Sequence, residues 1–266
     1  MKPHRPRKRF GQHFLHDAGI IARLVSAIRP AGEDNIIEIG PGEGVLTGPL
    51  LETGARVTAI ELDRDLAAAL PERLGFPERL EVIQADVLEV DLAAVGGQPM
   101  RVVGNLPYNI STPIMFHLFT WRESIVDMHF MLQKEVVDRL VASPGSKQYG
   151  RLSVMAAFHC RMERLFTVPP GAFRPPPKVD SAIIRMVPKT LDETMLERLP
   201  RLEKVVRHAF GQRRKTLRNA LKGLLDEKAI ESAGIDPKAR AETLTLEQYL
   251  ALADQLTSQQ ANQPTS

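Results

Sequence analysis

The chain has 266 residues, of which 43% are hydrophobic, and a formal net charge of +3, so it can form one large α/β domain with a small appended domain. Its single cysteine, Cys160, excludes an internal disulfide and a cysteine-cluster metal site, and we expect no bound metal. There is no apolar run long enough to cross a bilayer and no signal-peptide pattern, so we expect a cytoplasmic protein.

Charge is distributed unevenly along the chain. Residues 1–9 hold five Lys or Arg and no acid, residues 36–91 hold twelve acids against four bases, and residues 197–222 hold nine bases against two acids. Two basic blocks around an acidic middle favour a polyanionic partner such as nucleic acid over merely solvated termini. The candidate phosphate contacts are Arg7, Lys8, Arg9, Arg213, Arg214, Lys215 and Arg218.

The first elements are typical of a doubly wound α/β sheet that binds a nucleotide. Asp17 is a candidate N-cap for a helix that ends before Pro30. A buried strand over 35–39 runs into Gly40-Pro41-Gly42-Glu43-Gly44, and an amphipathic helix follows to Leu51. In this strand–turn–helix order, Gly40 and Gly42 let a ligand approach the backbone closely.

Two further strands each end near an acid. The strand over 56–60 leads into Glu61, whose carboxylate can accept hydrogen bonds from both hydroxyls of a ribose. The strand over 80–84 leads to Asp86, which is placed to meet an adenine edge. The alternative is that both acids are solvated strand ends. The glycine spacing differs from the Gly-x-Gly-x-x-Gly pattern of dinucleotide sites, which disfavours a nicotinamide oxidoreductase.

The loop Gly104-Asn105-Leu106-Pro107-Tyr108 follows a fourth strand that ends with Val102-Val103. The side-chain oxygen of Asn105 and the carbonyl of Leu106 can each accept one hydrogen of an exocyclic amine. That arrangement frees the nitrogen lone pair to attack an electrophilic methyl group. Pro107 fixes the direction of the Leu106 carbonyl, and Tyr108 offers a face for stacking. An ordinary β-turn accounts for these residues equally well. Together with the glycine turn, the loop favours S-adenosylmethionine as the ligand.

The rest of the chain is predicted to complete the sheet and then to become helical. The proline-rich stretch 169–181 holds Phe173 on a stiff loop that suits stacking on a base, although by itself a core Phe in a connector is the favoured interpretation. The periodicity of 152–160 fits either a helix or a strand. The other predicted helices cover 112–119, 134–141, 196–209, 215–225, 227–233 and 246–256, and the other strands cover 125–132 and 182–187.

The order of these motifs resembles a known family, the small-subunit ribosomal RNA adenine dimethyltransferases (KsgA or RsmA). The similarity runs from about Arg7 to the C-terminal helices, and each stretch is weak evidence alone but specific in combination. The matching stretches are 9–15, 38–42, 61–63, 104–110, 130–136, 149–153, 175–181 and 213–217.

The resemblance implies a fold, an activity and a partner. It implies a class I S-adenosylmethionine-dependent methyltransferase, with a Rossmann-like doubly wound sheet and a small all-helical C-terminal domain. We expect the methyltransferase domain over 1–190, a helical RNA-binding domain over 191–258 and a disordered tail over 259–266. The implied reaction is dimethylation at N6 of two adjacent adenosines in the 3′-terminal hairpin of 16S rRNA, late in the assembly of the small subunit. We expect a monomer.

The resemblance also assigns roles to individual residues. It assigns donor contacts to His13, Leu15, Gly40, Glu61, Asp86 and Asn105, and the target adenine to Asn105, Leu106, Tyr108 and Phe173. Position 13 is His where many members have Asn, and either side chain can hydrogen-bond the carboxylate end of the donor. Two alternatives remain open, namely a large-subunit rRNA adenine methyltransferase and a ribosome-assembly binding factor built on a methyltransferase scaffold.

Overall fold

The structure is a computed structural model, and it describes residues 13–75, 78–107, 110–212 and 214–261. Its contacts divide the chain into two compact units. Unit 1 comprises residues 1–137 and 161–188, and unit 2 comprises residues 138–160 and 189–266. Each unit is described by itself.

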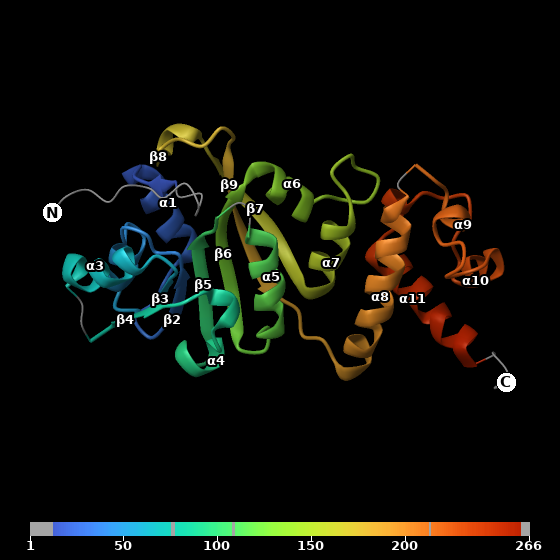
Figure 1. Cartoon of the computed structure of the whole chain (residues 1–266), viewed down its shortest axis with the longest axis horizontal. Coiled ribbons are helices and arrows are strands. Elements are labelled where there is room, and N and C mark those ends of the chain that lie inside the picture. Colours follow the sequence, from blue (N-terminus) through green and yellow to red (C-terminus); the bar gives the residue numbers. More distant parts are fainter. Residues whose placement is uncertain (1–12, 76–77, 108–109, 213, 262–266) are drawn as a thin grey trace. The chain divides into compact units, whose positions relative to one another are not determined.

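Strands form a seven-stranded sheet and a two-stranded sheet (Figure 1). In space the large sheet runs β4-β3-β2-β5-β6-β9-β7, and the small sheet pairs β1 with β8. In chain order the strands are β1 (Phe14–Leu15), β2 (Asn35–Ile39), β3 (Arg56–Glu61), β4 (Leu80–Gln84), β5 (Met100–Asn105), β6 (Ile125–Gln133), β7 (Cys160–Val168), β8 (Phe173–Arg174) and β9 (Ser181–Pro188).

Helices connect the strands of unit 1 and make up most of unit 2. They are α1 (Ala18–Ile28), α2 (Thr47–Glu52), α3 (Arg64–Leu74), α4 (Leu92–Val95), α5 (Ser111–Thr120), α6 (Lys134–Leu140), α7 (Arg151–His159), α8 (Glu193–Gly211), α9 (Leu217–Ala220), α10 (Glu227–Ser232) and α11 (Leu246–Ala261). The described residues also form short 3-10 turns, namely η2 (Val87–Glu89), η3 (Pro170–Ala172) and η4 (Ala241–Thr243). Within the described ranges, no helix combines the length and apolar character needed to cross a membrane.

The arrangement of the parallel strands confirms the predicted doubly wound α/β fold. β2 pairs in parallel with β3 on one side and with β5 on the other, and β5 pairs in parallel with β6. The chain order therefore reverses between β2 and β5, which makes this the switch point where such sheets bind ligands beyond their carboxyl ends. β9 then adds to β6 in the antiparallel direction.

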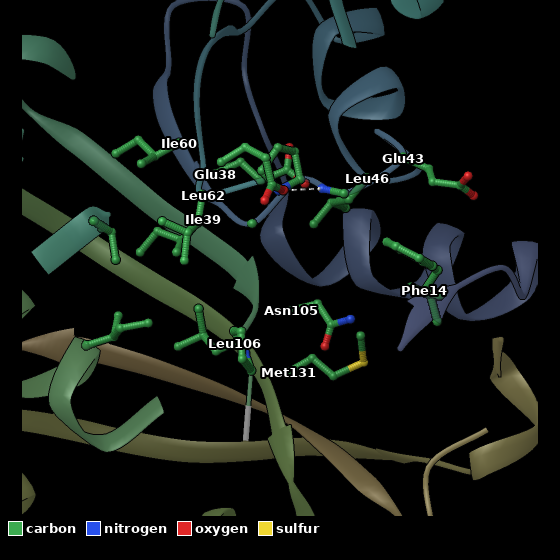
Figure 2. Close-up of a pocket in the computed structure, with 18 of the residues that line it drawn as sticks. Phe14, Glu38, Ile39, Glu43, Leu46, Ile60, Leu62, Asn105, Leu106 and Met131 are labelled. Carbon is green, nitrogen blue, oxygen red and sulfur yellow. Dashed lines mark hydrogen bonds between the residues drawn. The ribbon is translucent and has the colours of Figure 1, made fainter. Parts of the chain in front are cut away.

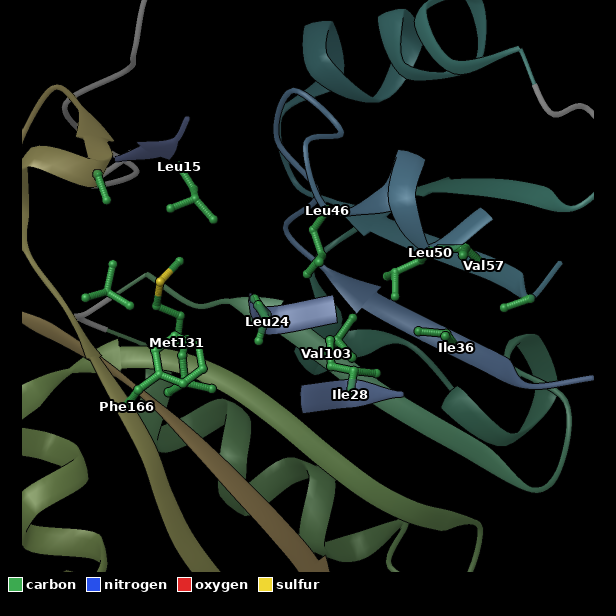
Figure 3. Packing of buried hydrophobic residues seen from close by; sticks show 14 of the residues in the cluster. Leu15, Leu24, Ile28, Ile36, Leu46, Leu50, Val57, Val103, Met131 and Phe166 are labelled. Carbon is green, nitrogen blue, oxygen red and sulfur yellow. The ribbon is translucent and has the colours of Figure 1, made fainter. Parts of the chain in front are cut away.

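A hydrophobic core fixes the N-terminal segment against the large sheet (Figure 3). Leu24 and Ile28 are the buried residues of α1, which begins at its predicted cap, Asp17. They belong to one cluster with Leu15 of β1 and Val103 of β5. Since burying a Leu or Ile side chain stabilises a fold by about 1.5–3 kcal/mol, this cluster holds β1 firmly beside the end of β5.

Several predicted elements differ from the structure. The helix expected over 215–225 is only α9, which follows an extended Thr216 and ends at Ala220; Gly223, within the predicted range, adopts a φ of +84°, which is incompatible with a helix. β7 has no counterpart among the predicted elements, since its exposed Arg, Glu and Thr residues mask the alternation of an edge strand. The ambiguous stretch 152–160 is mostly helix α7. The last helix, α11, continues to Ala261, into the segment expected to be a disordered tail, since an established helix gains one hydrogen bond per added residue. Residues 262–266 lie outside the described part.

Unit 2 packs α8 and α11 together with α7 and its preceding loop. The hydroxyl of Tyr149 donates to the carbonyl of Leu244 at 2.8 Å, and the N–H of Gly145 donates to the carbonyl of Glu242 at 2.7 Å. These long-range bonds explain why residues 138–160 group with the C-terminal helices. The domain limits expected from the sequence, 1–190 and 191–258, stay a prediction.

Arg101, at the start of β5, joins the sheet to the C-terminal end of α1. Its guanidinium donates to both carboxylate oxygens of Asp127, at 2.8 and 3.0 Å, and to Asp34 at 2.8 Å. It also donates to the carbonyls of Ile28 and Arg29 at the end of α1, at 2.6 and 3.2 Å. Burial would raise the pKa of Asp127, but the Arg101 guanidinium keeps that pKa below its ordinary value. Arg101 thus satisfies two helix-end carbonyls and two carboxylates at once.

We expect Arg101→Met to lower the free energy of unfolding by about 3–5 kcal/mol, because it leaves the buried Asp127 without its main partner. Urea unfolding followed by circular dichroism measures this change. The matched control is Arg56→Met, since Arg56 is exposed at the start of the neighbouring strand β3. Equal stability of the two variants would show that the Arg101 cluster does not hold the fold together.

Candidate functional site

A pocket of about 330 Å³ opens at the carboxyl ends of β2, β3 and β5. In Figure 2, Glu38 and Leu46 lie above Asn105 and Met131. The lining of the pocket includes most of the predicted site residues, which come from separate parts of the chain: His13, Leu15, Gly40, Gly42, Glu61, Asp86, Asn105, Leu106 and Pro107.

Two glycines of the turn after β2 are required by the backbone and by packing. Gly40 and Gly42 have φ values of +67° and +58°, which residues with a Cβ rarely adopt. A Cβ at Gly42 would also lie 3.2 Å from the ring of Phe14. The turn therefore presents bare backbone to the pocket, as the sequence predicts for close approach of a ligand.

Glu61 is buried, so it is not the solvated strand end that was the alternative. Its Oε2 accepts from the N–H of Gly42 at 3.1 Å, and its Oε1 accepts from the N–H of Asp63 at 2.9 Å. Burial raises the pKa of this carboxyl, although the two N–H groups act against that rise. Glu61 thus ties the end of β3 to the glycine turn, which is a structural role beyond its predicted contact with a ribose.

Asp86 lies on the pocket wall at the end of β4. One of its oxygens, Oδ1, accepts from the N–H of Leu88 at 3.0 Å and caps η2. This cap fixes the carboxylate in place at the pocket. Its predicted contact with an adenine edge stays a prediction.

Asn105 is held by the N-terminal segment. Its Nδ2 donates to the backbone carbonyl of His13 at 3.0 Å. The other end of the amide, Oδ1, is an acceptor on a residue that lines the pocket. Next to it, Leu106 is buried, and its N–H donates to the carbonyl of Met131 at 3.2 Å. Hydrogen bonds to the N-terminal segment and to β6 therefore orient the Asn105 side chain and the Leu106 backbone.

The aromatic residues predicted to stack on a base are placed differently. Tyr108 lies outside the described residues. Phe173 is only 3% exposed and belongs to the core cluster, and it is not among the residues that line the pocket. Phe173 therefore packs as a core residue in this arrangement, in one cluster with Leu15, Phe166 and Ile183. Its stacking role stays a prediction.

The predicted phosphate contacts are only partly described. Arg214, Lys215 and Arg218 are exposed, and Arg218 lies 3.4 Å from Glu227 in a surface pair that contributes little stability. Arg7, Lys8, Arg9 and Arg213 lie outside the described residues. Exposure leaves the three described cations available to a polyanion.

Glu38 is a pocket residue without a role in the sequence-based assignment. It is 2% exposed, and its Oε2 has no hydrogen-bond partner among the described residues. Burial raises the pKa of its carboxyl to about 7; the hydroxyl of Thr47 acts against this rise, and the charge of Glu61 adds to it. A carboxylate inside the apolar strand Ile36-Ile37-Glu38-Ile39 is the signal that points to it. Among the residues described, no group of three or more His, Cys, Asp or Glu could hold a metal ion.

Comparison with known proteins gives consistent matches. The family profile described as "Ribosomal RNA adenine dimethylase" matches residues 3–258. Proteins named "Ribosomal RNA small subunit methyltransferase A" are similar over 95% of this chain. The one from Methylococcus capsulatus is 57% identical over 98% of its own length, and the one from Acinetobacter baylyi is 54% identical over 93%.

Two solved structures share the fold over most of both chains. A dimethyladenosine transferase from Plasmodium falciparum has a TM-score of 0.78 and 25% identity, and the alignment covers 93% of this chain and 98% of that one. The 23S rRNA methyltransferase ErmE has a TM-score of 0.73 and 29% identity, with 92% and 99% covered. These similarities confirm the methyltransferase fold that the sequence predicts.

We expect Glu61→Ala to weaken the binding of S-adenosylmethionine by roughly 1.5–3 kcal/mol, the typical contribution of a hydrogen bond to a charged group. The change also frees the N–H groups of Gly42 and Asp63, so we expect a lower melting temperature. Calorimetric titration and thermal unfolding measure the two effects. Glu81→Ala, at an exposed position of β4, is the matched control. Unchanged donor affinity in a folded Glu61→Ala variant would remove Glu61 from the site.

Proposed function

The chain belongs to the ribosomal RNA adenine dimethylase family, and on that premise we propose which residues perform its reaction. The proposed reaction moves methyl groups from S-adenosylmethionine to N6 of two adjacent adenosines in the 3′-terminal hairpin of 16S rRNA. Membership confirms the resemblance inferred from the motifs. The names of the relatives at 54% and 57% identity support the small subunit as the substrate.

The pocket fits S-adenosylmethionine. Gly40 and Gly42 offer a backbone surface that a Cβ would obstruct, and Glu61 and Asp86 bring carboxylates to two neighbouring strand ends. Leu15, Leu46 and Leu62 add apolar surface. We assign the methionine end of the donor to His13, its ribose to Glu61 and its adenine to Asp86. When bound, the donor supplies a methyl group that is already strongly electrophilic.

The observation that carries the proposal is the hydrogen bond between Asn105 Nδ2 and the His13 carbonyl. Because this bond fixes the orientation of the amide, Oδ1, which is its acceptor end, is placed to accept a hydrogen from the N6 amine. The Leu106 carbonyl is the second proposed acceptor. Two acceptors on one amine draw its nitrogen toward a tetrahedral geometry, which exposes the lone pair to the methyl group.

The remaining contribution of the chain is positioning and exclusion of water. Leu106 and Met131 are about 1% exposed, so buried apolar side chains form the side of the pocket next to Asn105. In such surroundings the hydrogen bonds of Asn105 are stronger than they are in water. A strong general base is not required, because alignment of the amine with an activated methyl lowers the barrier.

The large-subunit alternative shares this fold, since ErmE superposes on most of the chain. The test is transfer of labelled methyl groups to small and large ribosomal subunits that lack the modification. We expect label only in the small subunit, on two adjacent adenosines. Label in the large subunit would support the alternative, and absence of transfer to both would favour a binding factor.

We also propose a cytoplasmic protein, because small ribosomal subunits are the substrates that the relatives' names indicate. We propose in addition that it is a monomer, which no name addresses. Size-exclusion chromatography with light scattering measures the oligomeric state. A stable dimer would contradict the monomer without affecting the proposed reaction.

We expect Asn105→Ala to slow single-turnover methyl transfer by roughly 100-fold or more, because the amine loses an acceptor and its alignment. Binding of the small subunit should remain, since Asn105 contacts no phosphate in the proposal. Single-turnover assays and filter binding on one preparation measure both. The control is Asn35→Ala, because Asn35 donates to the Pro99 carbonyl at the opposite end of β2. A rate equal to that of the control would contradict the mechanism.

We expect the double variant Arg214→Ala, Lys215→Ala to bind the small subunit more weakly, because lysines and arginines on phosphates release counterions. Each lost phosphate contact should flatten the log–log dependence of affinity on salt by roughly 0.7–0.9. Binding at several salt concentrations measures the slope. The charge-matched control is Lys228→Ala, Lys238→Ala, at exposed positions of the same unit. Equal slopes for the two variants would show that Arg214 and Lys215 do not contact RNA.

A further inference from the structure

Glu38 places a buried carboxyl group in the pocket without a positively charged partner among the described residues. Its carboxylate is 2% exposed, and Oε2 has no hydrogen-bond partner among the described residues. A second buried carboxylate, that of Glu61, is close enough to repel it. Both oxygens of Glu61 accept from backbone N–H groups. Within this pair of carboxylates, Oε2 of Glu38 is therefore the oxygen that a ligand can approach.

No Lys or Arg among the described residues forms an ion pair with Glu38. The charged group facing it is Glu61 from β3, and the other titratable residues that line the pocket are His13, Glu43 and Asp86. A buried, unpaired carboxylate is costly, so it requires either a cation or a proton. Since the described residues place no cation there, we take the carboxyl to hold a proton in the free protein and to face a cationic ligand in the bound state.

We propose that Glu38 is a positioning residue for the positively charged methyl donor, and that its carboxyl ionises and releases a proton to solvent when the donor binds. The inference rests on the proposed function, because it takes S-adenosylmethionine as the donor. The donor carries a sulfonium and an ammonium group, and either lowers the cost of the ionised carboxylate. The proton that leaves Glu38 is taken up by the buffer, so charge is balanced.

The coupling predicts how the affinity depends on pH. The pKa of Glu38 in the free pocket is about 7, so roughly half of the protein must lose this proton on binding at pH 7, and more at pH 6. Affinity should then be weaker at pH 6 than at pH 7 by roughly fivefold. The pH range from 6 to 7 lies below the pKa of an α-amino group such as that of the donor, which is about 7.7–8.0. The donor's amino group therefore stays mostly protonated over this range.

Titration calorimetry with S-adenosylmethionine on the full chain tests the proposal. Phosphate and Bis-Tris differ in ionisation enthalpy, so the difference between the heats measured in them gives the number of protons released. For the wild type we expect roughly half a proton at pH 7, more at pH 6, and the fivefold loss of affinity. For Glu38→Gln, which keeps the shape of the side chain, we expect the pH dependence to flatten and the proton release to fall below that of the wild type.

Glu81→Gln, the same substitution at an exposed position of β4, is the control and should behave as the wild type does. Donor binding by the wild type without proton release would overturn the inference while leaving the proposed donor intact, even if Glu38→Gln does not fold. Equal proton release by the wild type and a folded Glu38→Gln variant would overturn it as well. Absence of any donor binding by the wild type would instead refute the proposed donor, and the inference with it.

Discussion

The pocket depends on the close approach of β2 and β5 at their carboxyl ends. In the parallel register, Ile39 lies opposite both Ile60 and Gly104, which brings three strand ends together. A Cβ at Gly104 would lie 2.6 Å from the backbone oxygen of Ile39, so only glycine allows this spacing. The spacing places Asn105 beside the glycine turn and within reach of the His13 carbonyl. Without it, the acceptor on β5 and the turn after β2 would not share one cavity.

Two buried carboxylates next to each other give the pocket its charge preference. Glu61 is fixed by the N–H groups of Gly42 and Asp63, so its burial helps to shape the glycine turn. Glu38 has no comparable partner for Oε2 among the described residues. Because like charges at close range and low dielectric cannot both ionise cheaply, the site favours a cationic occupant. We therefore propose that the residues that build the cavity also select the charge of its ligand.

Sequence patterns predicted the sheet well because its signals are local. The strands over 35–39 and 80–84 have the predicted bounds, since each is a short run between turn residues. Features that depend on distant contacts were not predicted. The grouping of 138–160 with the C-terminal helices requires the bond from Tyr149 to Leu244, and no local pattern indicates that partner. The identity of Glu38 as an unpaired acid likewise depends on what surrounds it in space.

Phe173 shows how packing and recognition compete for one ring. The register of β1 with β8 pairs Leu15 with Phe173, and the His13 Nδ1 bonds to the Pro175 carbonyl at 2.8 Å, so this loop is fastened to the pocket wall. Exposing a buried Phe costs about 1.5–3 kcal/mol, whereas stacking of a base on an aromatic ring contributes about 1–3 kcal/mol. The cost of exposing the ring and the gain from stacking nearly cancel. A base could therefore draw Phe173 out of the core only if its other contacts, such as those with Asn105 and Leu106, supply the difference. That balance would make the ring's exposure a consequence of substrate binding and not a property of the free protein.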